Sequence, residues 1–406
     1  MPAVLLIGTL DTKGEECAYV RDRLRAHGCA VLTVDVGVLG RPAYAADVTR
    51  ERVAAAAGTD LATLARRGDR GRAIEAMGRG AAAIVRERAG SIDAVVALGG
   101  SGGASVAARA FAELPLGFPK LLVSTVAAGD TRPYLAGGDV ALVYPVVDLA
   151  GLNPISERVL TNAVAAVAGM AAVAQAAPAP AGPVVALTMF GITTPCVDRV
   201  RARLRERGYV PVVFSANGAG GDAMEDLIDS GAVSGVVDVT TTELADRQVG
   251  GRLVARERRL EAAGERGIPQ VVSLGALDVV NFGPWDTVPE RFRARRLHRH
   301  NAEVTLMRTC PEECAALGRA IAHKLNRGRG PRCVVVPLRG LSALSAAGAP
   351  FHDPAADAAL FDALRASLAD DVELVELDCH INDPDFADVL AERFEAAYAH
   401  KEPMTR

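Results

Sequence analysis

The sequence predicts two α/β domains, each built on a doubly wound, Rossmann-like parallel β-sheet. The chain has 406 residues, which is more than one hydrophobic core usually serves. Short Val-rich apolar runs alternate with helical patterns, as is typical of parallel sheets covered on both faces. A Pro- and Ala-rich segment at 174–183 predicts a semi-rigid linker between the domains.

Both domains open with the same plan of apolar run, Thr-containing turn, basic amphipathic helix, Gly and second apolar run. The segments "VRDRLRAHG" and "VRARLRERG" carry the helix and end at Gly28 and Gly208. Glycine is favoured just after a helix because it adopts positive φ without strain. We therefore expect a β-α-β unit at the start of a nucleotide-binding domain, residues 1–175, and again at the start of a second domain, residues 183–406.

Further buried strands follow each opening unit. Because ligands bind beyond the carboxyl ends of strands in open parallel sheets, the segments after these strands are the candidate sites. The expected strands span 92–100, 120–125 and 140–148 in the first domain, and 233–243, 268–276, 333–338 and 372–377 in the second.

Composition excludes several classes of protein. The net charge of −4 gives no overall attraction to nucleic acid or anionic membranes. The first residues lack the basic segment of a signal peptide, and the Ala-rich stretch 163–177 predicts a buried helix rather than a membrane span. Seven scattered cysteines indicate a cytoplasmic protein, and the C-x3-C pair Cys310 and Cys314 has no matching pair to form a zinc site.

The segment "LGGSGGAS" follows the third expected strand and precedes a helix. Without Cβ atoms, the backbone around Ser101 can approach an anion closely, and the helix N-terminus adds positive dipole character. The pattern favours a phosphate site, although a tight strand–helix turn would also use glycine. The candidate ligands are Gly99, Gly100, Ser101, Gly102 and Gly103.

The segment "GTLDTKGEE" after the first strand supports the same ligand. Lys13 can neutralise phosphate, Thr9 and Thr12 can donate to it, and Asp11 with phosphate oxygens suits Mg²⁺. The alternative is an ordinary helix start, with Thr12 as N-cap and Glu15 completing a capping box.

Two further strand ends belong to the same candidate pocket. Asp35 ends the second strand, where an acid can accept a ribose hydroxyl or simply face solvent. Ser124, Thr125 and Gly129, in "STVAAGD", either line the pocket or form a plain loop.

The second domain has its own cluster of chemically useful side chains. Asp278, His300 and Arg308 offer an acid, an imidazole and a guanidinium and are the candidate catalytic residues. The alternatives are surface or core-edge positions, and the basic run "RFRARRLHRH" is typical of a solvated face. Another glycine-rich segment, "NGAGG" at 217–221, also precedes an expected helix.

Several of these segments together resemble one known family. "GTLDTKGEE", "LGGSGGAS", "PKLLVSTVAAGD", "SLGALDVVNFG" and "HNAEVTLMRT" are similar, in order and spacing, to the N-terminal domain family of the tomato mosaic virus resistance protein. The resemblance covers nearly the whole chain and includes many uncharacterised bacterial relatives.

The resemblance implies an ATP-binding protein with two α/β halves that forms a homodimer. It places the ATP site in the first half, on the "TLDTK" and Gly-rich loops and beside "STVAAGD". The plant member inhibits viral RNA replication by binding the viral replication protein, an activity we do not expect here. The plant protein also has a C-terminal barrel domain, for which we expect a separate partner protein.

Three functions remain open at this point. The first is a nucleotide-binding module that acts through partner contact or as a dimer. The second is an enzyme that uses ATP or a phosphorylated metabolite in the cleft between the domains. The third is an enzyme whose Gly-rich loop binds the phosphate of its substrate.

Overall fold

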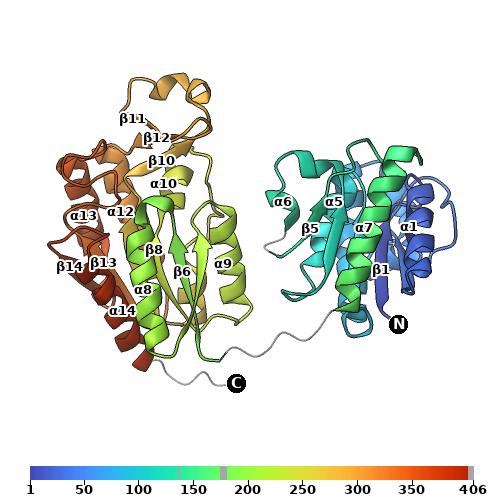
Figure 1. Cartoon of the computed structure of the whole chain (residues 1–406), viewed down its shortest axis with the longest axis horizontal. Helices are drawn as coiled ribbons and strands as arrows, with labels where there is room; N and C mark the ends of the chain where they lie inside the picture. Colours follow the sequence, from blue (N-terminus) through green and yellow to red (C-terminus); the bar gives the residue numbers. More distant parts are fainter. Residues whose placement is uncertain (136–137, 174–180, 401–406) are drawn as a thin grey trace. The chain divides into compact units, whose positions relative to one another are not determined.

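The computed structural model describes residues 1–135, 138–173 and 181–400, which form two compact units, 1–178 and 179–406 (Figure 1). Most of the expected linker at 174–183 lies outside the described residues.

The first unit contains a five-stranded sheet in the order β2-β1-β3-β4-β5, with every neighbouring pair parallel. The expected strands are present, although that at 140–148 is reduced to three residues. The strands are β1 (Ala3–Gly8), β2 (Ala30–Asp35), β3 (Ala94–Leu98), β4 (Lys120–Val123) and β5 (Ala141–Val143). The α-helices are α1 (Gly14–Ala26), α2 (Arg50–Ala56), α3 (Leu61–Arg67), α4 (Arg70–Arg88), α5 (Ser101–Phe111), α6 (Arg132–Leu135) and α7 (Pro154–Ala172).

Helices cover both faces of this sheet, as the continuous apolar character of its strands requires. In β1, Leu5 and Ile7 pack into a core with α4 and α5. The alternate residues Val4 and Leu6 pack into a second core with α1 and α7. The doubly wound arrangement predicted for the first domain is confirmed.

The second unit contains a six-stranded parallel sheet in the order β14-β13-β9-β8-β6-β7. Its opening β6-α8-β7 unit matches β1-α1-β2, and Gly28 and Gly208 follow the two helices with φ of 77° and 83°. The strands are β6 (Val184–Met189), β7 (Val210–Ser215), β8 (Gly235–Thr240), β9 (Gln270–Gly275), β13 (Arg332–Pro337) and β14 (Glu373–Leu377). The α-helices are α8 (Thr194–Glu206), α9 (Ala219–Asp229), α10 (Thr242–Val249), α11 (Ala262–Arg266), α12 (Pro311–Asn326), α13 (Pro354–Ser367) and α14 (Pro384–Ala399).

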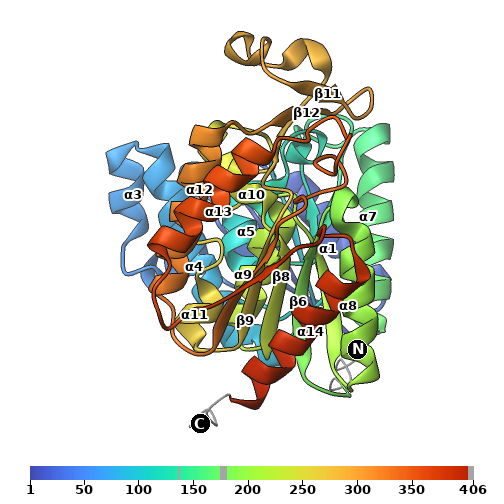
Figure 2. The ribbon, with the colours of Figure 1, turned by 90° about the vertical axis from the view of Figure 1, so that its left-hand side faces the viewer.

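A small antiparallel sheet in the second unit was not predicted. It consists of β10 (Val279–Phe282), β12 (Thr305–Arg308) and β11 (Leu297–Arg299), and it lies above the top edge of the larger sheet (Figures 1 and 2). Every residue of β10 and β12 is buried, so these strands lack the alternation of polar and apolar residues that identifies antiparallel strands.

No helix among the described residues is long and apolar enough to cross a membrane. The Ala-rich stretch contributes to α7, where Ala163, Val164 and Val167 are buried against the sheet, as predicted. Its residues 174–177 lie outside the described residues.

Candidate functional site: a pocket at the strand ends of the first unit

A cavity of about 690 Å³ lies at the carboxyl ends of β1 and β3. These strands are adjacent, and chain connections leave them in opposite directions across the sheet. Such a topological switch point is where open α/β sheets bind ligands. The sequence-predicted residues that line the cavity are Thr9, Asp11, Thr12, Lys13, Gly99, Gly100, Ser101, Gly102, Gly103 and Thr125.

The Gly-rich loop forms the start of α5, and no side chain caps this helix. A Cβ on Gly99 would lie 2.8 Å from the Gly103 Cα, so glycine at 99 is needed for the turn itself. A Cβ on Gly100 would meet nothing within 4 Å. A tight turn therefore explains Gly99 but not Gly100, whereas close approach of a ligand to the uncapped helix end explains both.

The segment between β1 and α1 brings hydroxyls and an ammonium group to the same cavity. The alternative interpretation of this segment, a capping box with Thr12 as N-cap, is wrong, because the N-cap of α1 is Lys13 and its side chain does not cap the helix. Thr12 Oγ1 instead bonds to Thr9 Oγ1 at 2.7 Å. The Lys13 ammonium donates to the Leu149 carbonyl, a neutral group, and forms no ion pair with any described residue. Its charge therefore remains available to an anion.

Asp11 lines the cavity and also contacts the loop after β2. Its Oδ2 accepts the backbone N–H groups of Val38, Leu39 and Gly40 at 3.0–3.2 Å. Through Oδ2 the carboxylate therefore orders the loop after β2, which forms part of the cavity wall. Its Oδ1 is buried and has no hydrogen-bond partner among the described residues.

Asp35, proposed for a ribose hydroxyl, lies behind the cavity wall. Its side chain is buried, and Oδ1 accepts the N–H groups of Leu10 at 3.0 Å and Gly37 at 2.9 Å. Burial raises the pKa of this carboxyl group, and the two N–H groups oppose the rise. Ser124 is also buried and caps the turn at 125–128, and neither it nor Gly129 lines the cavity.

The structure adds wall residues that no sequence motif indicated. Asp69, Arg70 and Asp148 bring charge, and a set of aliphatic side chains forms an apolar wall. A pocket with a polar end and an apolar wall suits a ligand that joins phosphate to an uncharged group. The apolar wall consists of Val36, Val38, Leu39, Leu64, Ala73, Ile74, Met77 and Val106.

In the second unit the structure brings Asp278 and Arg308 near each other, because Val279 pairs with Arg308 across β10 and β12, but it leaves His300 apart from them. Arg308 N donates to Arg296 O at one end of the β11–β12 hairpin, and His300 N donates to Val304 O at the other. Four residues of strand separate these pairs, or roughly 13 Å. His300 is exposed, whereas Asp278 and Arg308 are buried.

The Arg308 guanidinium is fully engaged in the core. It donates to the Phe351 carbonyl at 2.9 Å and to Thr309 Oγ1 at 2.8 Å, and it pairs with Asp357. Asp278 accepts from Ser342 Oγ at 2.7 Å, and burial raises the pKa of this carboxyl group. These contacts join β12 to the segments before α13, which is a structural arrangement.

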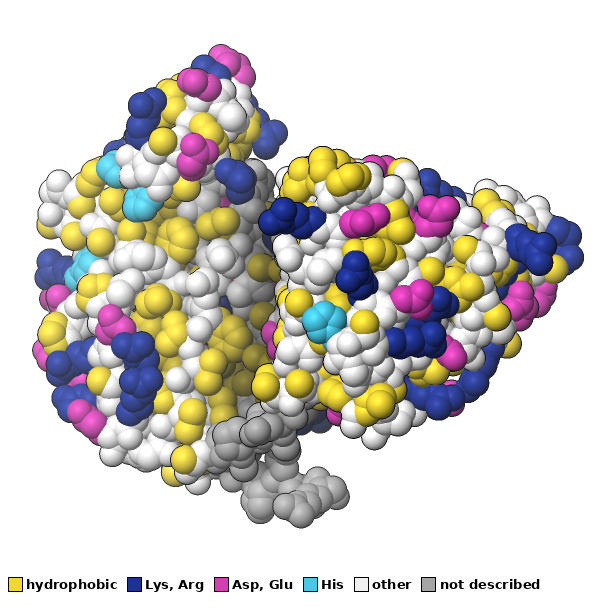
Figure 3. Space-filling model, turned by 45° about the vertical axis from the view of Figure 1, so that its right-hand side comes forward, with side chains coloured by type: hydrophobic (Ala, Val, Ile, Leu, Met, Phe, Trp, Pro, Cys, Tyr) yellow, Lys and Arg dark blue, Asp and Glu magenta, His cyan; other side chains and the backbone are white. Residues whose placement is uncertain are grey.

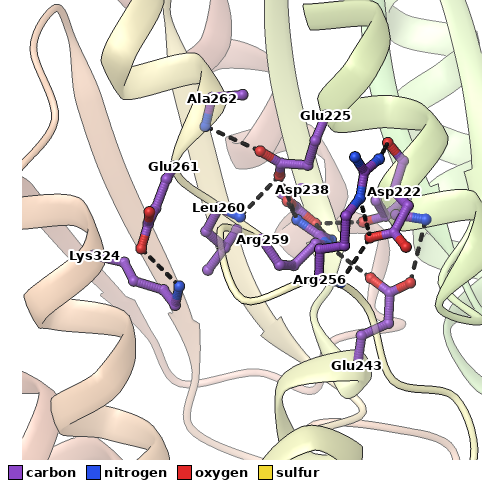
Figure 4. A network of polar contacts seen from close by, with 12 residues as sticks. Asp222, Glu225, Asp238, Glu243, Arg256, Arg259, Leu260, Glu261, Ala262 and Lys324 are labelled. Atoms are coloured by element: carbon purple, nitrogen blue, oxygen red, sulfur yellow. Dashed lines mark hydrogen bonds and ion pairs between the residues drawn. The ribbon is translucent and has the colours of Figure 1, made fainter. Parts of the chain in front are cut away.

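The second glycine-rich segment holds one of the protein's own carboxylates (Figure 4). Glu243 Oε1 accepts the N–H of Gly218 at 2.6 Å and of Gly221 at 3.2 Å. Its Oε2 accepts from the buried Arg259 guanidinium at 2.6 Å. Arg259 also forms a two-fold contact with Asp238, at 2.5 and 2.8 Å.

Among residues 1–135, 138–173 and 181–400, no group of three or more His, Cys, Asp or Glu side chains could hold a metal ion. Figure 3 shows basic and acidic side chains interspersed over the visible face.

Two family models match nearly the whole chain. The N-terminal domain model of the uncharacterised protein family UPF0261 matches residues 2–176, and its C-terminal domain model matches residues 182–398. The chain belongs to this family. The resemblance noted from the sequence is confirmed at this level, and the family carries no assigned function.

Relatives occur in bacteria and in a plant. A UPF0261 protein of Clostridium tetani is 45% identical, with 96% of this chain and 97% of the relative covered. One of Rhizobium meliloti is 46% identical over 96% and 97%. The ToMV susceptible protein tm-1(GCR26) of tomato is 39% identical over 97% of this chain but only 55% of its own length.

The similarity to solved structures does not indicate a function. A glycosyltransferase from Streptomyces sp. SF2575, complexed with thymidine diphosphate, aligns with 67% of this chain and 82% of its own at 17% identity. Its TM-score of 0.18 is too low to support a shared function.

Proposed function

We propose that this UPF0261 protein binds ATP in the cavity of the first unit and acts through a partner protein or as a dimer. The observation that carries the proposal is a 690 Å³ cavity at the switch point of the sheet, with an uncapped helix N-terminus on its wall. The Lys13 ammonium, which also lines the cavity, would complement the phosphates.

The form of the cavity supports a nucleotide over inorganic phosphate. An uncapped helix end and a cation suffice for phosphate alone, whereas the aliphatic wall needs an apolar partner to displace water from it. The base and ribose of a nucleotide supply that partner. Adenine in particular is an expectation from the family resemblance.

Mg²⁺ would enter with the nucleotide rather than occupy a prepared site. Asp11 already accepts three backbone N–H groups through Oδ2. Asp11 Oδ1 has no hydrogen-bond partner among the described residues, and Asp148 is exposed on the same wall with Oδ1 accepting the Leu149 N–H at 2.8 Å. These two carboxylates would face an ion carried by phosphate oxygens.

The first prediction concerns Lys13. Lys13→Ala removes the only lysine among the described residues that line the cavity and should weaken ATP binding more than tenfold, or by about 1.4 kcal/mol, in isothermal titration calorimetry. Arg72→Ala is the matched control, because Arg72 is an exposed cation outside the cavity wall. Equal ATP affinity in Lys13→Ala and wild type would remove ATP from this cavity.

The same samples distinguish a binding module from an ATP-using enzyme. ADP and phosphate are assayed after calorimetry with and without Mg²⁺. Binding without turnover supports a module whose conformation or dimer ATP stabilises. Turnover that Lys13→Ala abolishes makes the protein an enzyme and places its reaction at this cavity.

A further inference from the structure

Arg70 lines the cavity of the first unit, and its charge has no partner among the described residues. It is the first residue of α4, directly after Asp69, whose carboxylate caps the helix by accepting the Arg72 N–H at 3.0 Å. The neighbouring Arg72 is paired with Asp69. Arg70 therefore keeps the five guanidinium donors for another group.

The packing of α4 against α5 places this guanidinium beside the helix end that faces the cavity. One terminal nitrogen of Arg70 lies 3.7 Å from the point where a Cβ of Gly102 would be. The Ile74 side chain lies 3.1 Å from the same point. Glycine at 102 thus allows α4 to approach the first turn of α5, and the Arg70 guanidinium lies beside that turn.

Two cations on separate elements therefore line one cavity. Lys13 precedes α1 and already donates one hydrogen bond to the Leu149 carbonyl. Arg70 precedes the body of α4 and has donors to spare. A single phosphate at the α5 N-terminus is served by the helix amides and one cation, whereas each further phosphate adds charge that needs another.

We infer that Arg70 is the specificity-determining residue of this pocket: it binds the outer phosphate of the ligand and so discriminates nucleoside polyphosphates from monophosphates. This rests on the proposed nucleotide-binding function. A guanidinium suits the role because it forms two parallel hydrogen bonds to one phosphate.

The experiment compares ATP, ADP, AMP and inorganic pyrophosphate by calorimetry on wild type, Arg70→Ala, Arg70→Lys and the control Arg72→Ala. Arg70→Ala should weaken ATP binding about tenfold while AMP changes less than about twofold. Arg70→Lys should fall between, because an ammonium keeps the charge and loses the two-fold contact. Arg72→Ala should match wild type with every ligand.

The salt dependence gives a second readout. Because Arg70 adds one charge contact to ATP but none to AMP, Arg70→Ala should flatten the fall of ATP affinity with salt and leave that of AMP unchanged. Circular dichroism melting checks that each variant is folded, which we expect since both arginines are exposed.

The outcomes separate this inference from the proposed function. Wild-type ATP affinity in Arg70→Ala, or equal losses of ATP and AMP affinity, overturns the role of Arg70. A wild type that binds pyrophosphate but no nucleotide overturns the nucleotide function, and an Arg70→Ala loss of pyrophosphate then still supports the role. A wild type that binds neither overturns both.

Discussion

The two glycine-rich helix starts of this protein differ in what their backbone N–H groups contact. In the first unit the Gly99–Gly103 loop opens on a cavity. In the second unit the N–H groups of Gly218 and Gly221 donate to Glu243, which Arg259 also holds. The same local chemistry is therefore open to a ligand in one unit and filled by an internal carboxylate in the other.

The topology explains why the second site is filled. Gly99–Gly103 follows β3, which pairs with the first strand of its unit, whereas 217–221 follows the edge strand β7. The strand equivalent to β3 is β8, and Glu243 comes three residues after it, in the first turn of α10. A carboxylate thus stands at the place where the first unit has glycine, and it reaches the neighbouring loop.

The largest effect should come from breaking the filled site. Arg259→Leu leaves Asp238, Glu243 and Glu225, all at most 2% exposed, without their cation. Removing one partner of a buried ion pair costs about 3–5 kcal/mol. Urea denaturation should therefore show that much loss in the second unit, while ligand binding by the first unit stays at the wild-type level.

Arg258→Leu is the matched control for that change, because Arg258 is the adjacent arginine and its ion pairs are partly exposed. A loss as small in Arg259→Leu as in Arg258→Leu would show that the buried network adds little to stability. The comparison between a filled and an open site would then lose its energetic basis.

More of the open site in the first unit than of the filled site in the second could be predicted from the sequence. Thr9–Lys13 and Gly99–Gly103 share a wall because they follow the adjacent parallel strands β1 and β3, and strand ends are visible in the apolar pattern. The inward direction of Asp35 depends on the N–H groups of Leu10 and Gly37, which only the folded loop supplies.

Other parts depend on packing between segments far apart in the chain. Arg70 reaches α5 only because α4 packs on it at Gly102, and no local pattern encodes that approach. Likewise, His300 lies in the turn of the β11–β12 hairpin, which carries it away from Asp278 just before β10. The sequence predicted a catalytic cluster of these side chains because the small antiparallel sheet, which sets their positions, was not predicted.

A pH-dependent effect of intermediate size should come from α10, the helix that carries Glu243. Burial raises the pKa of Asp246 from 3.8 to about 7, although the N–H groups of Asn281 and Leu253 oppose the rise. Between pH 4 and 7 the folded state therefore binds a proton that the unfolded state does not. The free energy of unfolding should fall as pH rises through this range, by at least about 1.4 kcal/mol.

Asp246→Asn removes this titration, so its unfolding free energy should change less between pH 4 and 7 than that of wild type. Urea denaturation at several pH values measures both slopes. Equal slopes would mean that Asp246 is ionised in the folded protein throughout, and that its N–H donors outweigh the cost of burial.

The smallest effects come from the same substitution at the two glycine-rich sites. A Cβ at Gly221 would lie 2.4 Å from Glu243 Oε2, so Gly221→Ala must displace the carboxylate and should cost about 1 kcal/mol of stability. A Cβ at Gly100 would meet nothing, and its φ of −75° suits alanine. Gly100→Ala should therefore change stability by less than about 0.5 kcal/mol.

Ligand binding should respond in the opposite sense. Gly100→Ala places a methyl group where a phosphate would approach the α5 amides, and ATP affinity should fall several-fold, whereas Gly221→Ala should leave it unchanged. Urea denaturation and calorimetry give the stability and the ATP affinity of each variant. If Gly100→Ala lowers stability and spares binding, the first loop is a structural turn like the second. If instead Gly221→Ala loses stability and Gly100→Ala loses ATP affinity, the N–H groups filled by Glu243 contribute to the fold of the second unit. The open N–H groups of the first unit are then kept for a ligand.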